Sequence, residues 1–164
     1  MWKRVIIDEP DSIKLHITVP DTLIAIGNGQ LESVKMSDST ATYTWIVKNP
    51  INNYNVTINI GDYINIKDSL INSSGIHELN HYVLSYNEET AQRHFSQVRE
   101  VIHFFEKVFG EYPFWEDGYK LVETPYAGME HQSAIAYGNG YTTSGHYYVY
   151  DLVDYIILHE TAHE

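Results

Sequence analysis

Apolar and polar residues alternate along the first part of the chain, between about residues 12 and 67. Three runs there follow this alternation and are rich in β-branched residues: residues 13–19, 42–47 and 55–60. Turn-forming residues separate the runs, at residues 27–29 and 49–50 among others. This pattern predicts antiparallel strands that each bury one face.

The pattern changes in the middle of the chain. Short runs between residues 68 and 80, with a turn at residues 72–75, indicate a border between two parts. One more strand is expected at residues 81–86, and two others at residues 119–124 and 133–137.

A long amphipathic helix is expected after this middle strand. Asn87 is a suitable N-cap, and Glu88 and Glu89 suit the positive end of the helix dipole. Apolar residues then recur at helical spacing: Phe95, Val98, Ile102, Phe105 and Phe109. The helix should end at Gly110, before Pro113. After a loop at residues 144–145, a last helix should run from Leu152 into His159.

These elements together predict an α+β protein in two parts. Residues 1–78 form a partial N-terminal β domain, and residues 79–164 form a partial α+β domain that ends with the last helix.

Composition narrows the possible functions. The chain has 10 Lys and Arg against 22 Asp and Glu, so its formal net charge of -12 disfavours nucleic acid as a partner. No apolar run approaches the roughly 20 residues of a membrane span, and the first residues lead into Asp8 and Glu9 instead of an apolar signal core. Without cysteine, disulfides, thiolate metal sites and a cysteine nucleophile are excluded. Cellular compartment and oligomeric state stay open.

The most informative motif is His159-Glu160-Thr161-Ala162-His163, which has the HExxH pattern of zinc peptidases. On a helix the two histidines share one face and can bind one Zn²⁺, with Glu160 beside the metal as general base. Glu164 points away from that face and is expected to be a structural carboxylate. Chance is the alternative reading in a chain with nine histidines, but the position at the end of an apolar helical run favours a zinc site. Four other histidines lack such spacing and are expected at the surface or in the core: His77, His81, His94 and His103.

A second candidate site lies about thirty residues upstream. Glu130 follows a strand and a glycine, where an acidic side chain near a zinc centre could bind a cation such as a free α-amine. The alternative is an ordinary loop with one exposed glutamate.

Together, residues 127–131 (AGMEH) and 159–164 (HETAHE) resemble the aminopeptidase-N family of zinc peptidases, the gluzincins that include the leukotriene hydrolases. The resemblance extends to residues 8–20, 112–114 and 121–125, and it covers nearly the whole chain. His131 stands where the family usually has Asn.

The resemblance implies the following roles. His159 and His163 bind Zn²⁺, Glu160 is the general base, and Glu130 holds the N-terminal ammonium of a peptide substrate. Three neighbours of Glu130 would line the substrate cleft: Ala127, Gly128 and Met129.

The resemblance also implies a fold and the absence of two site residues from this chain. The chain would comprise the later part of an antiparallel β-sandwich domain and the first part of a thermolysin-like α+β catalytic domain. The third zinc ligand, a Glu about twenty residues after His163, and an oxyanion-stabilising Tyr would both lie beyond Glu164. We therefore expect the parent protein to be a zinc aminopeptidase and the 164-residue fragment to be inactive. The alternatives are an inactive peptidase-fold binding or scaffold protein, and an epoxide hydrolase like the leukotriene enzymes.

Overall fold

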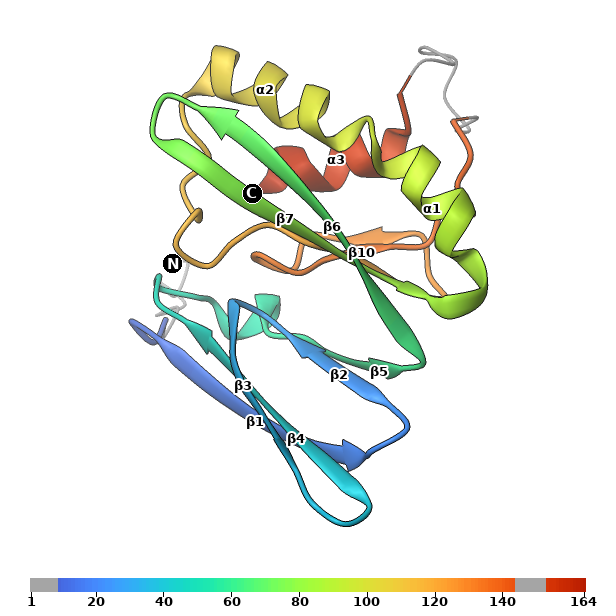
Figure 1. Ribbon diagram of the computed structural model, residues 1–164. Coiled ribbons are helices and arrows are strands. Elements are labelled where there is room, and N and C mark those ends of the chain that lie inside the picture. Colours follow the sequence, from blue (N-terminus) through green and yellow to red (C-terminus); the bar gives the residue numbers. More distant parts are fainter. Residues whose placement is uncertain (1–8, 144–152) are drawn as a thin grey trace, which may run out of the picture.

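The computed structural model describes residues 9–143 and 153–164. The first eight residues, the expected loop at residues 144–145 and the expected start of the last helix at Leu152 lie outside the described residues. Figure 1 shows a lower group of strands, a second sheet above it, and helices across the upper face of that sheet. Among the described residues, no helix is both long enough and apolar enough to span a membrane.

The lower group contains two small antiparallel sheets. Their strands are β1 (Ile13–Pro20), β4 (Thr40–Val47) and β3 (Gln30–Met36) in one, and β2 (Ile24–Gly27) and β5 (Ile58–Gly61) in the other. The β1 and β4 strands pair over eight residues, from Ile13 opposite Val47 to Pro20 opposite Thr40. Trp45 packs between the sheets, where its Nε1 donates a 2.9 Å hydrogen bond to the carbonyl of Ala25.

The expected strand at residues 55–60 begins later than its sequence pattern indicates. A short 3-10 helix, η1 (Asn53–Asn55), precedes it, and β5 starts at Ile58. The side chain of Asn52 accepts a 2.8 Å hydrogen bond from the backbone N–H of Tyr54, which stabilises this turn against an extended chain.

The upper sheet has five strands in the order β6-β7-β8-β10-β9. Their bounds are β6 (Tyr63–Asn72), β7 (Gly75–Leu84), β8 (Leu121–Glu123), β10 (Ile135–Tyr137) and β9 (Gly128–Met129). The β7-β8 and β8-β10 pairs are parallel and the outer pairs are antiparallel, so the sheet is mixed. The predicted α+β class is confirmed.

The expected border at residues 78/79 falls inside β7. The turn at residues 72–75 is present, but it joins β6 and β7 in one hairpin of the upper sheet. The chain instead passes from the lower sheet of β2 and β5 to the upper sheet between Gly61 and Tyr63. The division of the chain into two domains remains a prediction, and we propose that its limit lies near Asp62.

In the described part of the chain, three α-helices cover the upper sheet: α1 (Glu88–Phe95), α2 (Val98–Phe109) and α3 (Tyr155–His163). The prediction of one long helix was wrong, because the helix is interrupted between α1 and α2, at Ser96 and Gln97. There the side chains of Ser96 and Gln97 donate 2.7 Å hydrogen bonds to the carbonyls of Arg93 and His94, which satisfies the end of α1. The end of α2 at Gly110 is as expected, with a positive φ of 105°.

Asn87 does not act as the expected side-chain N-cap. Its Nδ2 donates a 2.7 Å hydrogen bond to Oε1 of Glu123 in β8. The sequence pattern could not reveal this, because Glu123 is 36 residues away and reaches the start of α1 only through the sheet.

The buried His81 in β7 makes the stability of this fold depend on pH. Its side chain packs against Phe95 and Tyr119, and burial lowers its pKa to about 4 from 6.5. The unfolded chain therefore takes up a proton at His81 as the pH falls below about 6.5, whereas the folded chain does so only near pH 4. We expect this histidine to remove about 2 kcal/mol from the free energy of unfolding between pH 7 and pH 5.

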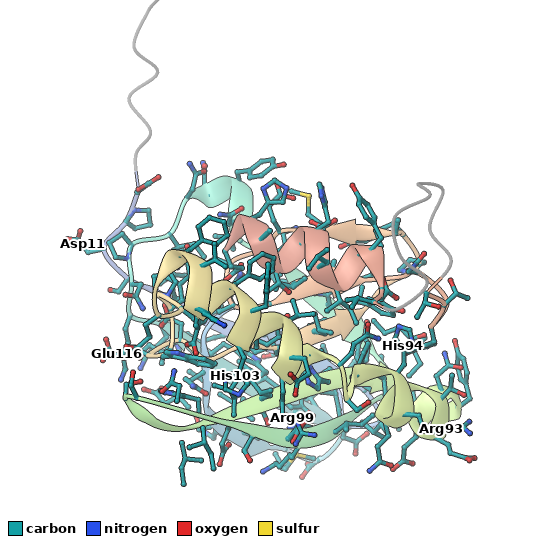
Figure 2. All side chains as sticks on the ribbon, turned by 90° about the horizontal axis from the view of Figure 1, so that it is seen from above. Asp11, Arg93, His94, Arg99, His103 and Glu116 are labelled. Atoms are coloured by element: carbon teal, nitrogen blue, oxygen red, sulfur yellow. The ribbon has the colours of Figure 1, made fainter. Side chains whose placement is uncertain are left out.

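Urea unfolding of His81→Gln at both pH values checks this prediction. The variant should lose less stability on acidification than the wild type. His103→Gln, a change of an exposed histidine on α2, is the matched control and should keep the wild-type difference (Figure 2). An unaltered pH dependence in His81→Gln would contradict the prediction.

Candidate metal centre

The candidate metal ligands lie on α3, whose first turn is fixed by Asp154. The buried carboxylate of Asp154 accepts hydrogen bonds from the backbone N–H groups of Ile156 (2.8 Å) and Ile157 (3.4 Å), as an N-cap does. It also contacts Nε2 of His94 at 2.7 Å and accepts a 2.7 Å hydrogen bond from the hydroxyl of Tyr137. Burial by itself raises the pKa of Asp154, but the hydrogen bonds from His94 and Tyr137 lower it below its ordinary value.

His159 and His163 bring two imidazole nitrogens together, one helical turn apart. Their Nε2 atoms are 3.3 Å apart. A tetrahedral zinc with Zn–N bonds of about 2.0–2.1 Å separates two ligand nitrogens by about 3.3 Å, so the pair fits this metal. Within the described residues, His159, Glu160 and His163 form a group whose candidate ligand atoms all lie within 4.8 Å of one another.

The other ring nitrogen of His159 also has a partner. Its Nδ1 lies 3.2 Å from the hydroxyl of Tyr155, and the two rings stack with centroids 5.1 Å apart. When Nε2 binds a metal, Nδ1 carries the proton and donates to this hydroxyl. Tyr155 therefore holds the ring with Nε2 directed toward His163.

Glu160 is buried against the edge strand β9. A Cβ atom added to Gly128 would lie 2.5 Å from Oε1 and 2.9 Å from Cγ of Glu160, so only glycine leaves room for this side chain. Burial raises the pKa of Glu160, the charge of His159 lowers it, and the charge of Glu130 raises it. Gly128 therefore allows the motif glutamate to pack on the strand backbone beside the two histidines.

Glu130 follows β9 directly. Its Oε1 accepts a 3.2 Å hydrogen bond from the hydroxyl of Tyr54. A hydrogen bond from its own backbone N–H lowers its pKa, with further lowering from Tyr54 and from the charges of His163 and His131. Glu130 therefore lies at the end of the strand whose Gly128 backbone packs against Glu160.

The structure places the remaining predicted residues around these groups. Met129 and Gly128 are half-buried in β9, and Ala127 is exposed just before it. His131, in the place of the family's usual Asn, donates its backbone N–H to the carbonyl of Met129, at 2.9 Å. In the described part of the chain, its buried Nδ1 has no hydrogen-bond partner.

Glu164 lies away from the histidine pair. Its Oε2 accepts a 2.6 Å hydrogen bond from the hydroxyl of Tyr112 and a 3.1 Å hydrogen bond from the N–H of Ser133. Burial raises the pKa of this carboxyl to about 7. Its contacts are those of a structural carboxylate that links the end of α3 to the loop after Glu130.

A cavity of about 360 Å³ lies on another side of α3, between the end of this helix and the segment formed by α2 and residues 110–113. Thr161, Ala162 and Glu164 line it, whereas His159 and His163 do not. The cavity is therefore separate from the histidine pair.

The contacts of Tyr54 with Glu130 and of Tyr155 with His159 were not predicted from the sequence. Tyr155 could have been found, because its spacing of four residues from His159 places both on one helix face. Tyr54 gave no such signal, because 76 residues separate it from Glu130 and only the packing of the two sheets brings them together.

The sequence matches no family model, and a search of curated proteins finds no match. Solved structures do match. A two-domain M1 zinc metallopeptidase mutant bound to L-arginine has a TM-score of 0.66 at 15% identity. An M1 zinc metallopeptidase mutant from Deinococcus radiodurans bound to a Tyr-Ser-Ala substrate has a TM-score of 0.68 at 15% identity, and another structure of a mutant from this organism has 0.67 at 16%.

Each match covers 93% of this chain and 33% of the solved chain, so the present chain spans about a third of the length of these structures. At 15–16% identity, the likeness shows the fold. It agrees with the family resemblance that residues 127–131 and 159–164 carry. The chain has the fold of the corresponding part of the M1 zinc metallopeptidases.

Proposed function

We propose that this chain is part of a zinc-dependent aminopeptidase that releases N-terminal residues from peptides. The observation that carries the proposal is the position of Glu130, which directly follows β9, the strand whose Gly128 backbone packs against the Glu160 side chain. A zinc site alone fits many hydrolases, but a carboxylate beside it suits a substrate with a free amine. The M1 fold supports this assignment, and one M1 neighbour is bound to a Tyr-Ser-Ala substrate.

In this proposal, His159 and His163 hold the zinc through Nε2. The bound metal supplies Lewis-acid chemistry, which polarises a carbonyl and makes water more acidic. The Glu160 carboxylate, between the two histidines along the helix, accepts a proton from the attacking water and later delivers it to the leaving amine.

Glu130 determines where the peptide is cut. Its carboxylate binds the α-ammonium of the substrate and so fixes the distance from that end of the peptide to the metal. Cleavage is thereby confined to the first peptide bond. The segment from Ala127 to Met129 lies directly before Glu130 and includes the edge strand β9, so we assign it to the substrate-binding surface.

The proposal includes a third zinc ligand. A catalytic zinc takes three protein ligands, and we expect the third to be a Glu about twenty residues after His163 in a thermolysin-like domain. We therefore expect the 164-residue chain alone to bind zinc weakly and to lack activity.

Replacing Glu130 with alanine tests the proposal in the zinc-loaded full-length protein. We expect turnover of leucine p-nitroanilide to fall by about 10²-fold, because the ammonium loses its charged partner. Zinc content should stay at the wild-type value, since Glu130 is not a ligand in this account. Glu100→Ala, which changes an exposed glutamate of α2, is the matched control and should leave both values unaltered. If Glu130→Ala lost its zinc, the assigned role would be wrong.

A further inference from the structure

Tyr54, which lies beside the lower group of strands, contacts Glu130 at the edge of the upper sheet. It lies in η1, next to the lower sheets, whereas Glu130 follows an edge strand of the upper sheet. The Tyr54 hydroxyl donates to Oε1 of Glu130 at 3.2 Å and lies 3.8 Å from the sulfur of Met129. Tyr54 is 63% exposed, so the contact lies where a substrate can reach it.

The fully buried side-chain amide of Asn28 links the segment after Tyr54 to the segment after Glu130. Nδ2 of Asn28 donates hydrogen bonds to the carbonyls of Asn55 at 2.9 Å and Gln132 at 2.6 Å. Its Oδ1 accepts a 2.7 Å hydrogen bond from the N–H of Thr57. One side chain thus ties the chain after Tyr54 to the loop after Glu130, so the approach of the hydroxyl to the carboxylate rests on buried hydrogen bonds.

The donor is neutral, which matters for binding an amine. A lysine or arginine at this place would compete with the substrate ammonium for the Glu130 carboxylate. A phenolic hydroxyl donates one hydrogen bond and leaves the negative charge in place. The hydrogen bond from Tyr54 takes up one acceptor site of Oε1, and an ionised carboxylate has about four such sites, so acceptor capacity remains for an ammonium ligand.

We propose that Tyr54 is a positioning residue for Glu130, which it orients so that the carboxylate receives the primary ammonium group of the ligand. This inference rests on the proposed aminopeptidase function and deepens it. The proposed amine site then includes Tyr54, which lies beside the lower group of strands.

The test uses Tyr54→Phe, Glu130→Ala and the double variant in the zinc-loaded full-length protein. Calorimetry measures the Kd of L-leucinamide, and kinetics measure KM and kcat for leucine p-nitroanilide. We expect Tyr54→Phe to raise Kd and KM by about 3- to 10-fold, with kcat within about 2-fold of the wild type. In the Glu130→Ala background, the same change should have no further effect, because the hydroxyl has lost its acceptor. Tyr86→Phe, which changes an exposed tyrosine of the 3-10 helix η2 (Ser85–Asn87), is the matched control and should be neutral.

Two results would overturn the inference alone, with the wild type still active. One is an unaltered Kd in Tyr54→Phe, and the other is an equal loss with and without Glu130. If the wild type bound L-leucinamide in a way that depends on both residues but did not hydrolyse the anilide, the aminopeptidase proposal would fail and the amine site would stand. A wild type that neither bound L-leucinamide nor hydrolysed the anilide would refute both.

Discussion

Replacing Glu160 with glutamine should lower peptide turnover by about 10³-fold in the zinc-loaded full-length protein, with zinc content unaltered. The amide has the shape of the carboxylate, so it fits against Gly128, where a Cβ atom would already lie 2.5 Å from Oε1. It cannot accept the proton of the attacking water. The expected defect is therefore in kcat, since neither histidine nor Glu130 is altered.

Steady-state kinetics with leucine p-nitroanilide and metal analysis of the same sample check this prediction. Glu100→Gln, on the exposed side of α2, is the matched control and should retain wild-type kcat. A Glu160→Gln protein with more than about a tenth of wild-type kcat would show that another group accepts the proton.

Replacing His163 with alanine should weaken zinc binding by at least about 10²-fold. The pair of Nε2 atoms, 3.3 Å apart, supplies two of the expected ligands, and the change leaves one of them. Glu164 cannot take over the vacant position, because its carboxylate is engaged by Tyr112 and Ser133.

Titration of the metal-free full-length protein with zinc measures this affinity. His103→Ala, which removes an exposed histidine of α2, should bind zinc as the wild type does. Equal affinity in His163→Ala and the wild type would remove His163 from the ligand set.

Local patterns predicted the helix that carries His159 and His163 and most strands correctly. Histidines four residues apart meet on any helix, and the Nε2 atoms of His159 and His163 do so. Alternation likewise indicated β1, where every second residue is exposed, whereas β4 is buried or half-buried on both faces.

Contacts between distant residues account for what the sequence did not reveal. The helical spacing of apolar residues continues across Ser96 and Gln97, although the helix is interrupted there. At this interruption the Gln97 side chain accepts a 2.7 Å hydrogen bond from the N–H of Asp154, which is 57 residues away. The contact of Tyr54 with Glu130 is equally non-local. The parallel pairing of β7 with β8 and of β8 with β10 follows from the crossovers between these strands.

The most direct test compares a peptide with its N-acetylated twin, each incubated with the zinc-loaded full-length protein and followed by mass spectrometry. Acetylation removes the ammonium that Glu130 is proposed to bind and leaves every peptide bond in place. The account predicts loss of single residues from the N-terminus of the free peptide and no cleavage of the acetylated one. Equal cleavage of both peptides, cleavage at internal bonds, or no cleavage of either would contradict it.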